Sequence, residues 1–118
     1  MGTILVADDE TYRNSLRKVL EKEGYTVRAT ADVDHALDEL DRNSFDLIVC
    51  DYRMPGKTGM DFLVELRKRR SAVPVLMISA HADAAIQAAA VALGALDMLA
   101  KPISRRELVD LAARFTGG

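Results

Sequence analysis

The feature that most constrains the fold of this chain is the regular alternation of short apolar runs with longer segments of helical periodicity. The apolar runs predict five strands, at residues 4–7, 25–29, 47–50, 75–78 and 96–100. After each run, apolar residues recur every three or four positions, as they do in an amphipathic helix. Strands that alternate with helices in this way predict an α/β fold, with a parallel sheet and right-handed crossovers.

The character of the runs predicts three layers, helix, sheet and helix. The runs at 4–7, 47–50 and 75–78 contain no polar residue, which is typical of central strands with helices on both faces. The run at 25–29 alternates in polarity, and we expect it to form a more exposed strand. Asp32 and Ser104 stand where the N-caps of two helices are expected.

Length and composition limit the classes of function. The 118 residues fit a single domain spanning 1–118. With 49% hydrophobic and 29% charged residues, the chain is typical of globular proteins, and its net charge of −2 predicts no direct binding of nucleic acid. The single cysteine, Cys50, excludes an internal disulfide and a cysteine-based zinc site, and we expect it in the core. No signal peptide or membrane span is predicted, so we expect a cytoplasmic protein.

Polar side chains follow four of the predicted strands. Asp8 and Asp9 follow the first strand, Asp51 the third, Ser79 the fourth and Lys101 the fifth. Open parallel sheets bind ligands beyond the carboxyl ends of their strands. Carboxylates gathered there repel one another and favour a hard cation such as Mg²⁺. With the cation bound, one carboxylate could act as a nucleophile, while an ammonium and a hydroxyl could hold phosphoryl oxygens.

Five short motifs occur in order along the chain. They are Val-Ala-Asp-Asp-Glu at 6–10, Asp-Tyr-Arg-Met-Pro-Gly at 51–56 with Thr58-Gly59, Ser-Ala-His at 79–81, Gly-Ala-Leu-Asp at 94–97 and Lys-Pro at 101–102. With these motifs the sequence resembles, along its whole length, the receiver domains of two-component response regulators, including the chemotaxis regulators. The resemblance implies a flavodoxin-like (βα)5 fold with strand order 2-1-3-4-5.

The resemblance also implies the chemistry. Asp51 would accept a phosphoryl group from a sensor histidine kinase or a histidine phosphotransfer protein and form an aspartyl phosphate. Asp8, Asp9, Asp51 and the backbone carbonyl of Arg53 would hold Mg²⁺, or Mn²⁺ in its place. The domain would be no enzyme in the usual sense, because it would catalyse only its own phosphoryl transfer and autodephosphorylation.

Other positions match the family in its phosphoryl-binding and tuning residues. Ser79 and Lys101 would bind the phosphoryl group, and the bond from Lys101 to Pro102 would be a cis peptide. Arg53 and His81 would tune dephosphorylation by helping or obstructing the attacking water.

Met98 departs from the family pattern. Receivers usually have an aromatic residue three positions before the lysine, and its ring turns inward on phosphorylation. A thioether can also change rotamer and fill a pocket, but it has no phenol with which to signal. The resemblance places the signalling surface on helix 84–93, strand 96–100 and the last helix after Ser104, where receivers often form homodimers.

Two helical surfaces are candidates for contacts with partners. In helix 84–93 we expect a core-facing stripe, formed by Ile86, Ala89, Ala90 and Leu93. The alanines outside this stripe reflect either high helix propensity or a flat face for a partner; they are Ala85, Ala88 and Ala92. By resemblance, the candidate docking face for the kinase lies on the first helix and includes Asn14, Arg17 and Lys18.

Two other functions compete with a phosphorylated receiver. A constitutive interaction module would never be phosphorylated, but such modules usually lack an acidic residue or the lysine, and this chain retains all of them. A Mg²⁺-dependent phosphohydrolase could use Asp51 as its nucleophile. Hydrolases of the haloacid dehalogenase type, however, have a second aspartate two residues on, where this chain has Arg53.

Overall fold

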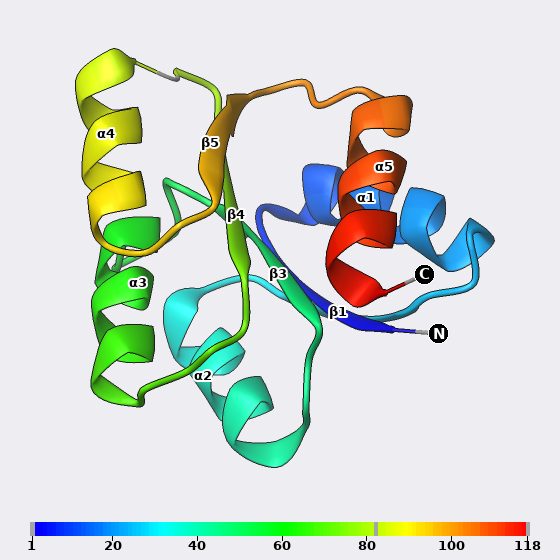
Figure 1. The fold of residues 1–118 in the computed structure, drawn as a ribbon, viewed down its shortest axis with the longest axis horizontal. Coiled ribbons are helices and arrows are strands. Elements are labelled where there is room, and N and C mark those ends of the chain that lie inside the picture. The colour runs from blue at the N-terminus through cyan, green and yellow to red at the C-terminus, as the bar shows by residue number, and fades with distance from the viewer. Residues whose placement is uncertain (1, 82, 118) are drawn as a thin grey trace.

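The computed structural model describes residues 2–81 and 83–117 and shows strands and helices that alternate along the chain (Figure 1). The strands are β1 (Thr3–Ala7), β2 (Thr26–Thr30), β3 (Leu47–Asp51), β4 (Val75–Ser79) and β5 (Asp97–Ala100). The helices are α1 (Glu10–Lys22), α2 (Val33–Arg42), α3 (Gly59–Lys68), α4 (Ala84–Ala92) and α5 (Arg105–Thr116).

The strands form one sheet in the order β2-β1-β3-β4-β5, and all neighbouring strands are parallel. This confirms the predicted topology. Helices α2, α3 and α4 cover one face of the sheet, while α1 and α5 cover the other (Figure 1). The parallel arrangement brings the carboxyl ends of β1, β3, β4 and β5 to a common edge, which is where the candidate site residues were predicted.

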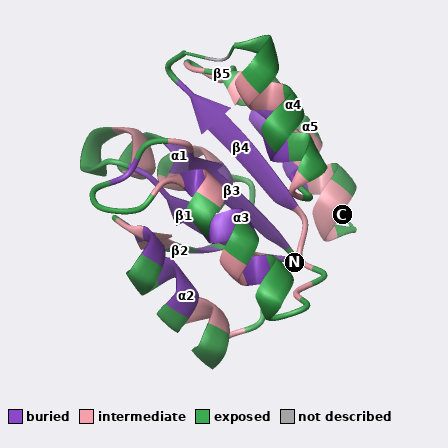
Figure 2. Cartoon of the chain, turned by 90° about the vertical axis from the view of Figure 1, so that its left-hand side faces the viewer, coloured by how far each residue is buried: buried purple, intermediate pink, exposed green. Residues whose placement is uncertain are grey.

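The core consists of two apolar clusters, one on each side of the sheet. Strands β1, β3 and β4 are buried almost throughout (Figure 2), which confirms them as the central strands. Each fully buried Leu or Ile side chain contributes about 1.5–3 kcal/mol. Cys50 lies in the cluster beneath α2 and α3, as predicted, and burial raises the pKa of its thiol.

Polar side chains fix the start of every helix. Asp32 and Ser104 accept N–H groups at the starts of α2 and α5, which confirms both predicted N-caps. At α3, Thr58 and Asp61 form a reciprocal capping box. Such caps typically contribute about 1 kcal/mol each to stability. The residue at which each helix begins is therefore determined by the sequence around its N-cap.

All five strands match their predicted bounds to within one residue; β1 begins one residue earlier than predicted, and β2 and β5 begin one residue later. The N–H of Tyr25 donates to the carbonyl of Leu20, so Tyr25 closes the end of α1 and β2 begins at Thr26. Strand β5 begins at Asp97, because Leu96 lies at the turn into the sheet and is partly exposed.

Helix α4 turns a partly different face toward the core from the one predicted. Ala90 is buried and Ile86 and Leu93 are half-buried, as predicted, but Ala89 is exposed. Gln87 is half-buried in its place, because its side-chain amide donates to the Asp97 carboxylate at 2.7 Å. A polar bond to β5 therefore sets the rotation of this alanine-rich helix.

Gly59 allows α3 to approach the sheet closely. A Cβ at this position would lie 2.8 Å from the backbone oxygen of Asp51 and would clash with the end of the Met77 side chain. Glycine is therefore required here for space, and α3 begins directly against the strand that ends at Asp51.

No helix among the described residues is both long and apolar enough to cross a membrane.

Candidate functional site

Three carboxylates gather at the carboxyl ends of β1 and β3. Asp8 directly follows β1, Asp9 is the N-cap of α1, and Asp51 is the last residue of β3. Each can offer one oxygen such that the three oxygens lie within 4.8 Å of one another. The Asp8 and Asp51 side chains are 0% and 11% exposed, whereas that of Asp9 is 62% exposed. The group thus opens to solvent on the side of Asp9.

Lys101 brings its ammonium into this group from the end of β5. Its Nζ lies 2.9 Å from Asp8 Oδ1, 3.4 Å from Asp51 Oδ2 and 3.6 Å from Asp9 Oδ2. The lysine side chain is only 14% exposed. The structure therefore assembles Asp8, Asp9, Asp51 and Lys101 into one cluster, which we call the acidic cluster.

The electrostatics of the cluster are dominated by the burial of Asp8. Burial raises the pKa of this carboxyl to about 7, and the charge of Asp51 adds to the increase. The hydrogen bonds from Lys101 and from the backbone of Asp9 act in the opposite direction. Among the residues that the structure describes, Asp8 Oδ2 is buried and finds no hydrogen-bond partner, so this oxygen is left unsatisfied by them.

The two other shifted groups remain charged. The pKa of Asp9 is lowered, first by the hydrogen bond from the N–H of Tyr12 and then by the charge of Lys101. Burial lowers the pKa of the Lys101 ammonium, but the bonds and charges of Asp8 and Asp51 outweigh burial and raise it above its usual value.

Three further residues were predicted for the site, namely Ser79, His81 and Arg53. Ser79 ends β4 and is buried; its carbonyl accepts the N–H of Lys101 at 2.8 Å, and its hydroxyl accepts the N–H of His81 at 3.2 Å. The side chains of His81 and Arg53 are exposed. Within residues 2–81 and 83–117, none of these three side chains hydrogen-bonds to the carboxylates.

Met98 lies inside the protein. It is 2% exposed, pairs with Met77 across β4 and β5, and packs in the apolar cluster beneath α3 and α4. Its backbone N–H donates to Asp97 Oδ1, the same oxygen that binds Gln87. Directly after β5, the peptide bond between Lys101 and Pro102 is cis.

Tyr12 is a neighbour of the cluster that the sequence did not single out as functional. Helical spacing predicts it as an apolar contact of α1, and it does pack at the edge of the core. Its ring also lies beneath the Lys101 ammonium, with Nζ 4.4 Å from the ring centroid. No spacing rule links positions so far apart in sequence, so only the folded structure reveals this contact.

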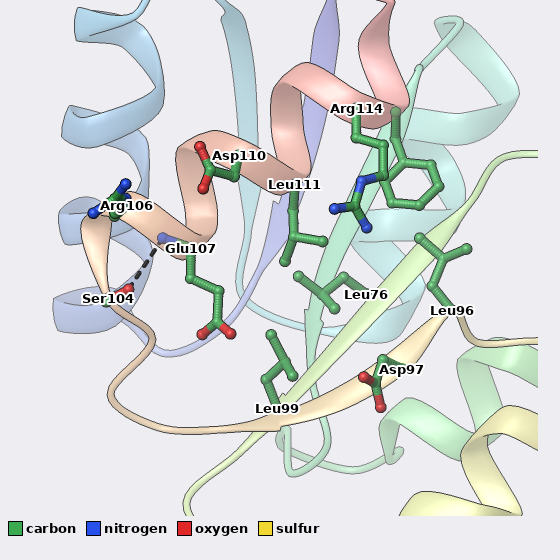
Figure 3. A pocket seen from close by; sticks show the side chains of 11 residues that line it. Leu76, Leu96, Asp97, Leu99, Ser104, Arg106, Glu107, Asp110, Leu111 and Arg114 are labelled. Atoms are coloured by element: carbon green, nitrogen blue, oxygen red, sulfur yellow. Dashed lines mark hydrogen bonds between the residues drawn. The ribbon is translucent and has the colours of Figure 1, made fainter.

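A separate hollow of about 600 Å³ lies between β5 and α5 (Figure 3). Its floor is apolar and includes Leu76, Leu99 and Leu111, while Asp97 and Arg114 are among its charged lining residues. No residue of the acidic cluster lines it. It belongs to the surface of β5 and α5 and not to the cluster.

The cluster combines two chemical capabilities. Three carboxylate oxygens suit a hard divalent cation, since Mg²⁺ prefers oxygen ligands. The adjacent ammonium suits an anion with several oxygens, such as a phosphoryl group. A carboxylate between a cation site and an ammonium is in a position to act as a nucleophile toward phosphorus.

Comparison with known proteins finds similarity to response regulators. Residues 3–113 match the response regulator receiver domain. The chain is 37% identical over 108 residues to the sensory transduction protein RegX3 of Mycobacterium tuberculosis, and 41% identical over 106 residues to the transcriptional regulatory protein CpxR of Escherichia coli. These matches cover 92% and 90% of this chain but 47% and 45% of the relatives. The chain thus spans about half the length of these curated relatives.

Solved structures agree with the sequence matches. The receiver domain of the Francisella response regulator 1452 has a TM-score of 0.93 at 29% identity, over 99% of this chain and 98% of that one. The beryllofluoride-activated receiver domain dimer of NtrC4 has a TM-score of 0.92 at 26% identity, with the same coverage. Together with the matched residues 3–113, these likenesses show that the chain belongs to the family of response regulator receiver domains.

Proposed function

We propose that this chain is a phosphoacceptor receiver in which Asp51 takes a phosphoryl group from a sensor histidine kinase or a histidine phosphotransfer protein. One observation carries the proposal. Asp51 lies beside two other carboxylates and 3.4 Å from the ammonium of Lys101, and it is the only one of the three carboxylates that ends a central strand.

The donor set fits a divalent cation. Asp8, Asp9 and Asp51, with the backbone carbonyl of Arg53, are the residues that would hold Mg²⁺, or Mn²⁺. The buried and unpartnered Oδ2 of Asp8 supports this assignment, because a buried carboxylate oxygen without a partner is costly. When bound, the cation supplies positive charge that offsets the charge gathered at phosphorus.

The transfer step requires a nucleophile and an acceptor for the released electron pair. A carboxylate oxygen of Asp51 forms a bond to phosphorus while the P–N bond of the donor phosphohistidine breaks. The electron pair of that bond returns to the imidazole nitrogen. Lys101 and Ser79 then hold the phosphoryl oxygens, which requires Lys101 to exchange its bond to Asp8 for one to the phosphoryl group.

The phosphorylated domain would then change the surface that signals and would finally lose its phosphoryl group to water. The side chains of Arg53 and His81 are exposed, and they would control the approach of water. Contacts made by Ser79 and Lys101 shift the balance between two states of the surface of α4, β5 and α5. Met98 is already buried, so the change passes through repacking beneath α4 and not through entry of an aromatic ring.

Two surfaces are proposed for partners. The α1 face with Asn14, Arg17 and Lys18 would receive the kinase. The surface of α4, β5 and α5 would signal to a partner or an output domain, and two copies of the chain would dimerise through it. Alanines of α4 are exposed near that surface, as are Val91 and Leu96.

The test is the intact mass of the protein after incubation with acetyl phosphate, whose acetate is the leaving group. We expect a gain of one phosphoryl group with Mg²⁺ and no gain after the cation is removed by EDTA. Restoring Mg²⁺ should restore the gain. Absence of any gain from acetyl phosphate and from a panel of phosphorylated histidine kinases would contradict the proposal and favour an interaction module.

The raised pKa of Asp8 predicts how Mg²⁺ acts on stability. In the metal-free protein, Asp8 holds its proton to about pH 7 in the folded state but only to its usual value of 3.8 in the unfolded state. Stability should therefore fall as the pH rises through this interval. Mg²⁺ requires the ionised carboxylate, so the increase in Tm that it gives should grow over the same interval and be largest above pH 7.

Thermal unfolding with and without Mg²⁺, at pH values on both sides of the pKa of Asp8, measures this dependence. Asp8→Asn is the control, since it removes the titrating group and should flatten the pH dependence of the metal-free Tm. A Mg²⁺ effect that is equally large on both sides of this pKa would show that Asp8 ionisation does not limit binding.

A further inference from the structure

Tyr12 contacts both the lysine of the acidic cluster and the segment that follows it. The Lys101 Nζ lies 4.4 Å from the centroid of the Tyr12 ring, well within the range of a cation–π interaction. At the other end of the ring, the hydroxyl oxygen accepts the backbone N–H of Ile103 at 2.8 Å. One side chain in the first turns of α1 thus binds two residues of the connection between β5 and α5.

The ring is fixed on more than one side. Its carbon atoms pack at the edge of the apolar cluster between the sheet, α1 and α5. The backbone N–H of Tyr12 donates to Asp9 Oδ1, which is part of the helix cap beside the cluster. The hydroxyl bond to Ile103 then sets the direction of the ring. Tyr12 is therefore a rigid platform, whereas a lysine side chain is intrinsically mobile.

We propose that Tyr12 is a positioning residue, whose ring holds the Lys101 ammonium at the acidic cluster and whose hydroxyl ties that ring to the segment after Lys101. The inference rests on the proposed phosphoacceptor function for its effect on transfer, but the positioning itself is a property of the unphosphorylated protein.

The contact is useful because Lys101 has to change partners. In the structure its closest bond is to Asp8, and phosphoryl transfer would replace that bond by one to a phosphoryl oxygen. The ring of Tyr12 stays beside the ammonium during this exchange, because the ring is held by the core and by Ile103 and not by the carboxylates. An ammonium that is already ordered loses less conformational freedom when it meets the phosphoryl group.

The experiment separates the ring from the hydroxyl. Tyr12→Leu removes both, and we expect transfer from acetyl phosphate at saturating concentration to slow about 3- to 10-fold, as expected for a partly buried cation–π contact. Tyr12→Phe keeps the ring, so its transfer rate should stay within about 2-fold of wild type, while the amide of Ile103 should exchange its hydrogen faster. The matched control is Tyr25→Phe, at a buried tyrosine distant from the cluster in sequence. It should change neither the transfer rate nor the hydrogen exchange of the Ile103 amide.

A merely structural role is excluded by two further readouts. In a Lys101→Met background, Tyr12→Leu should cause no additional loss of transfer, because the effect acts through the ammonium. NMR relaxation of the Lys101 side-chain methylene groups should show greater mobility in Tyr12→Leu than in wild type and Tyr12→Phe, without any phosphoryl donor present.

The outcomes distinguish this inference from the proposed function. Equal mobility of Lys101 in wild type and Tyr12→Leu would overturn the inference, whether or not the protein is phosphorylated. An undiminished effect of Tyr12→Leu in the Lys101→Met background would also overturn it. A wild-type protein that accepts no phosphoryl group, but in which Tyr12→Leu frees Lys101, would contradict the proposed function and support the positioning contact.

Discussion

Asp51→Asn should abolish the Mg²⁺-dependent gain of a phosphoryl group, with a loss of transfer of at least about a thousand-fold, as expected when the nucleophile is removed. An amide oxygen at this position cannot form the acyl phosphate. The variant should remain folded, because the substitution removes a charge that repels the buried Asp8. Intact mass after incubation with acetyl phosphate and Mg²⁺ is the measurement.

The control for Asp51→Asn is Asp110→Asn, which changes an exposed carboxylate on α5 and should be phosphorylated like wild type. Reduction of the phosphorylated wild type with borohydride should convert the modified aspartate to homoserine and identify its position. Phosphorylation of Asp51→Asn at the wild-type rate, or homoserine at another position, would reject Asp51 as the acceptor.

Lys101→Met should slow transfer by about 100-fold or more, which is the usual cost of removing a group that stabilises developing charge at the reacting centre. The substitution removes the only ammonium within 4 Å of all three carboxylates in the part of the chain that the structure describes. Lys101→Arg should recover only part of the rate, because a planar guanidinium cannot reproduce the contacts of a compact ammonium.

Transfer rates from acetyl phosphate, taken at saturating Mg²⁺, measure this effect. Lys57→Met is the matched control: Lys57 also forms a close ion pair, 2.7 Å from Asp34, but both side chains are at least half exposed. Exposed pairs contribute little, so the control should transfer at the wild-type rate. A rate for Lys101→Met within a few-fold of that control would remove Lys101 from the proposed site.

Much of the fold could be predicted because a strand that is buried on both faces needs apolar residues throughout its length. The runs that become β1, β3 and β4 contain apolar residues on both faces, and that pattern is typical of central strands. The polar residue that ends each run then marks the edge of the sheet. Asp8, Asp51 and Lys101 could therefore be assigned to one site before their distances were known.

Other features could not be predicted because they depend on contacts between distant residues. The rotation of α4 is set by the bond between Gln87 and Asp97, and alanines on every side of the helix give periodicity no preference for one face. Tyr12 meets Ile103, 91 positions along the chain, and its spacing within α1 is that of an ordinary core residue. The depth at which Asp8 lies, and hence its raised pKa, also follows from the packing of the whole sheet.

The bond between Lys101 and Asp8 joins residues 93 positions apart, and this separation has a consequence for a chain still being synthesised. Proteins leave the ribosome from the N-terminus, so the three carboxylates emerge well before β5 and its lysine. Until the last strand has docked beside β4, the growing chain has the proposed acceptor carboxylate without the ammonium that would hold the incoming group. On the proposed function, a nascent chain that has not yet formed β5 should therefore compete poorly with the folded domain for a kinase.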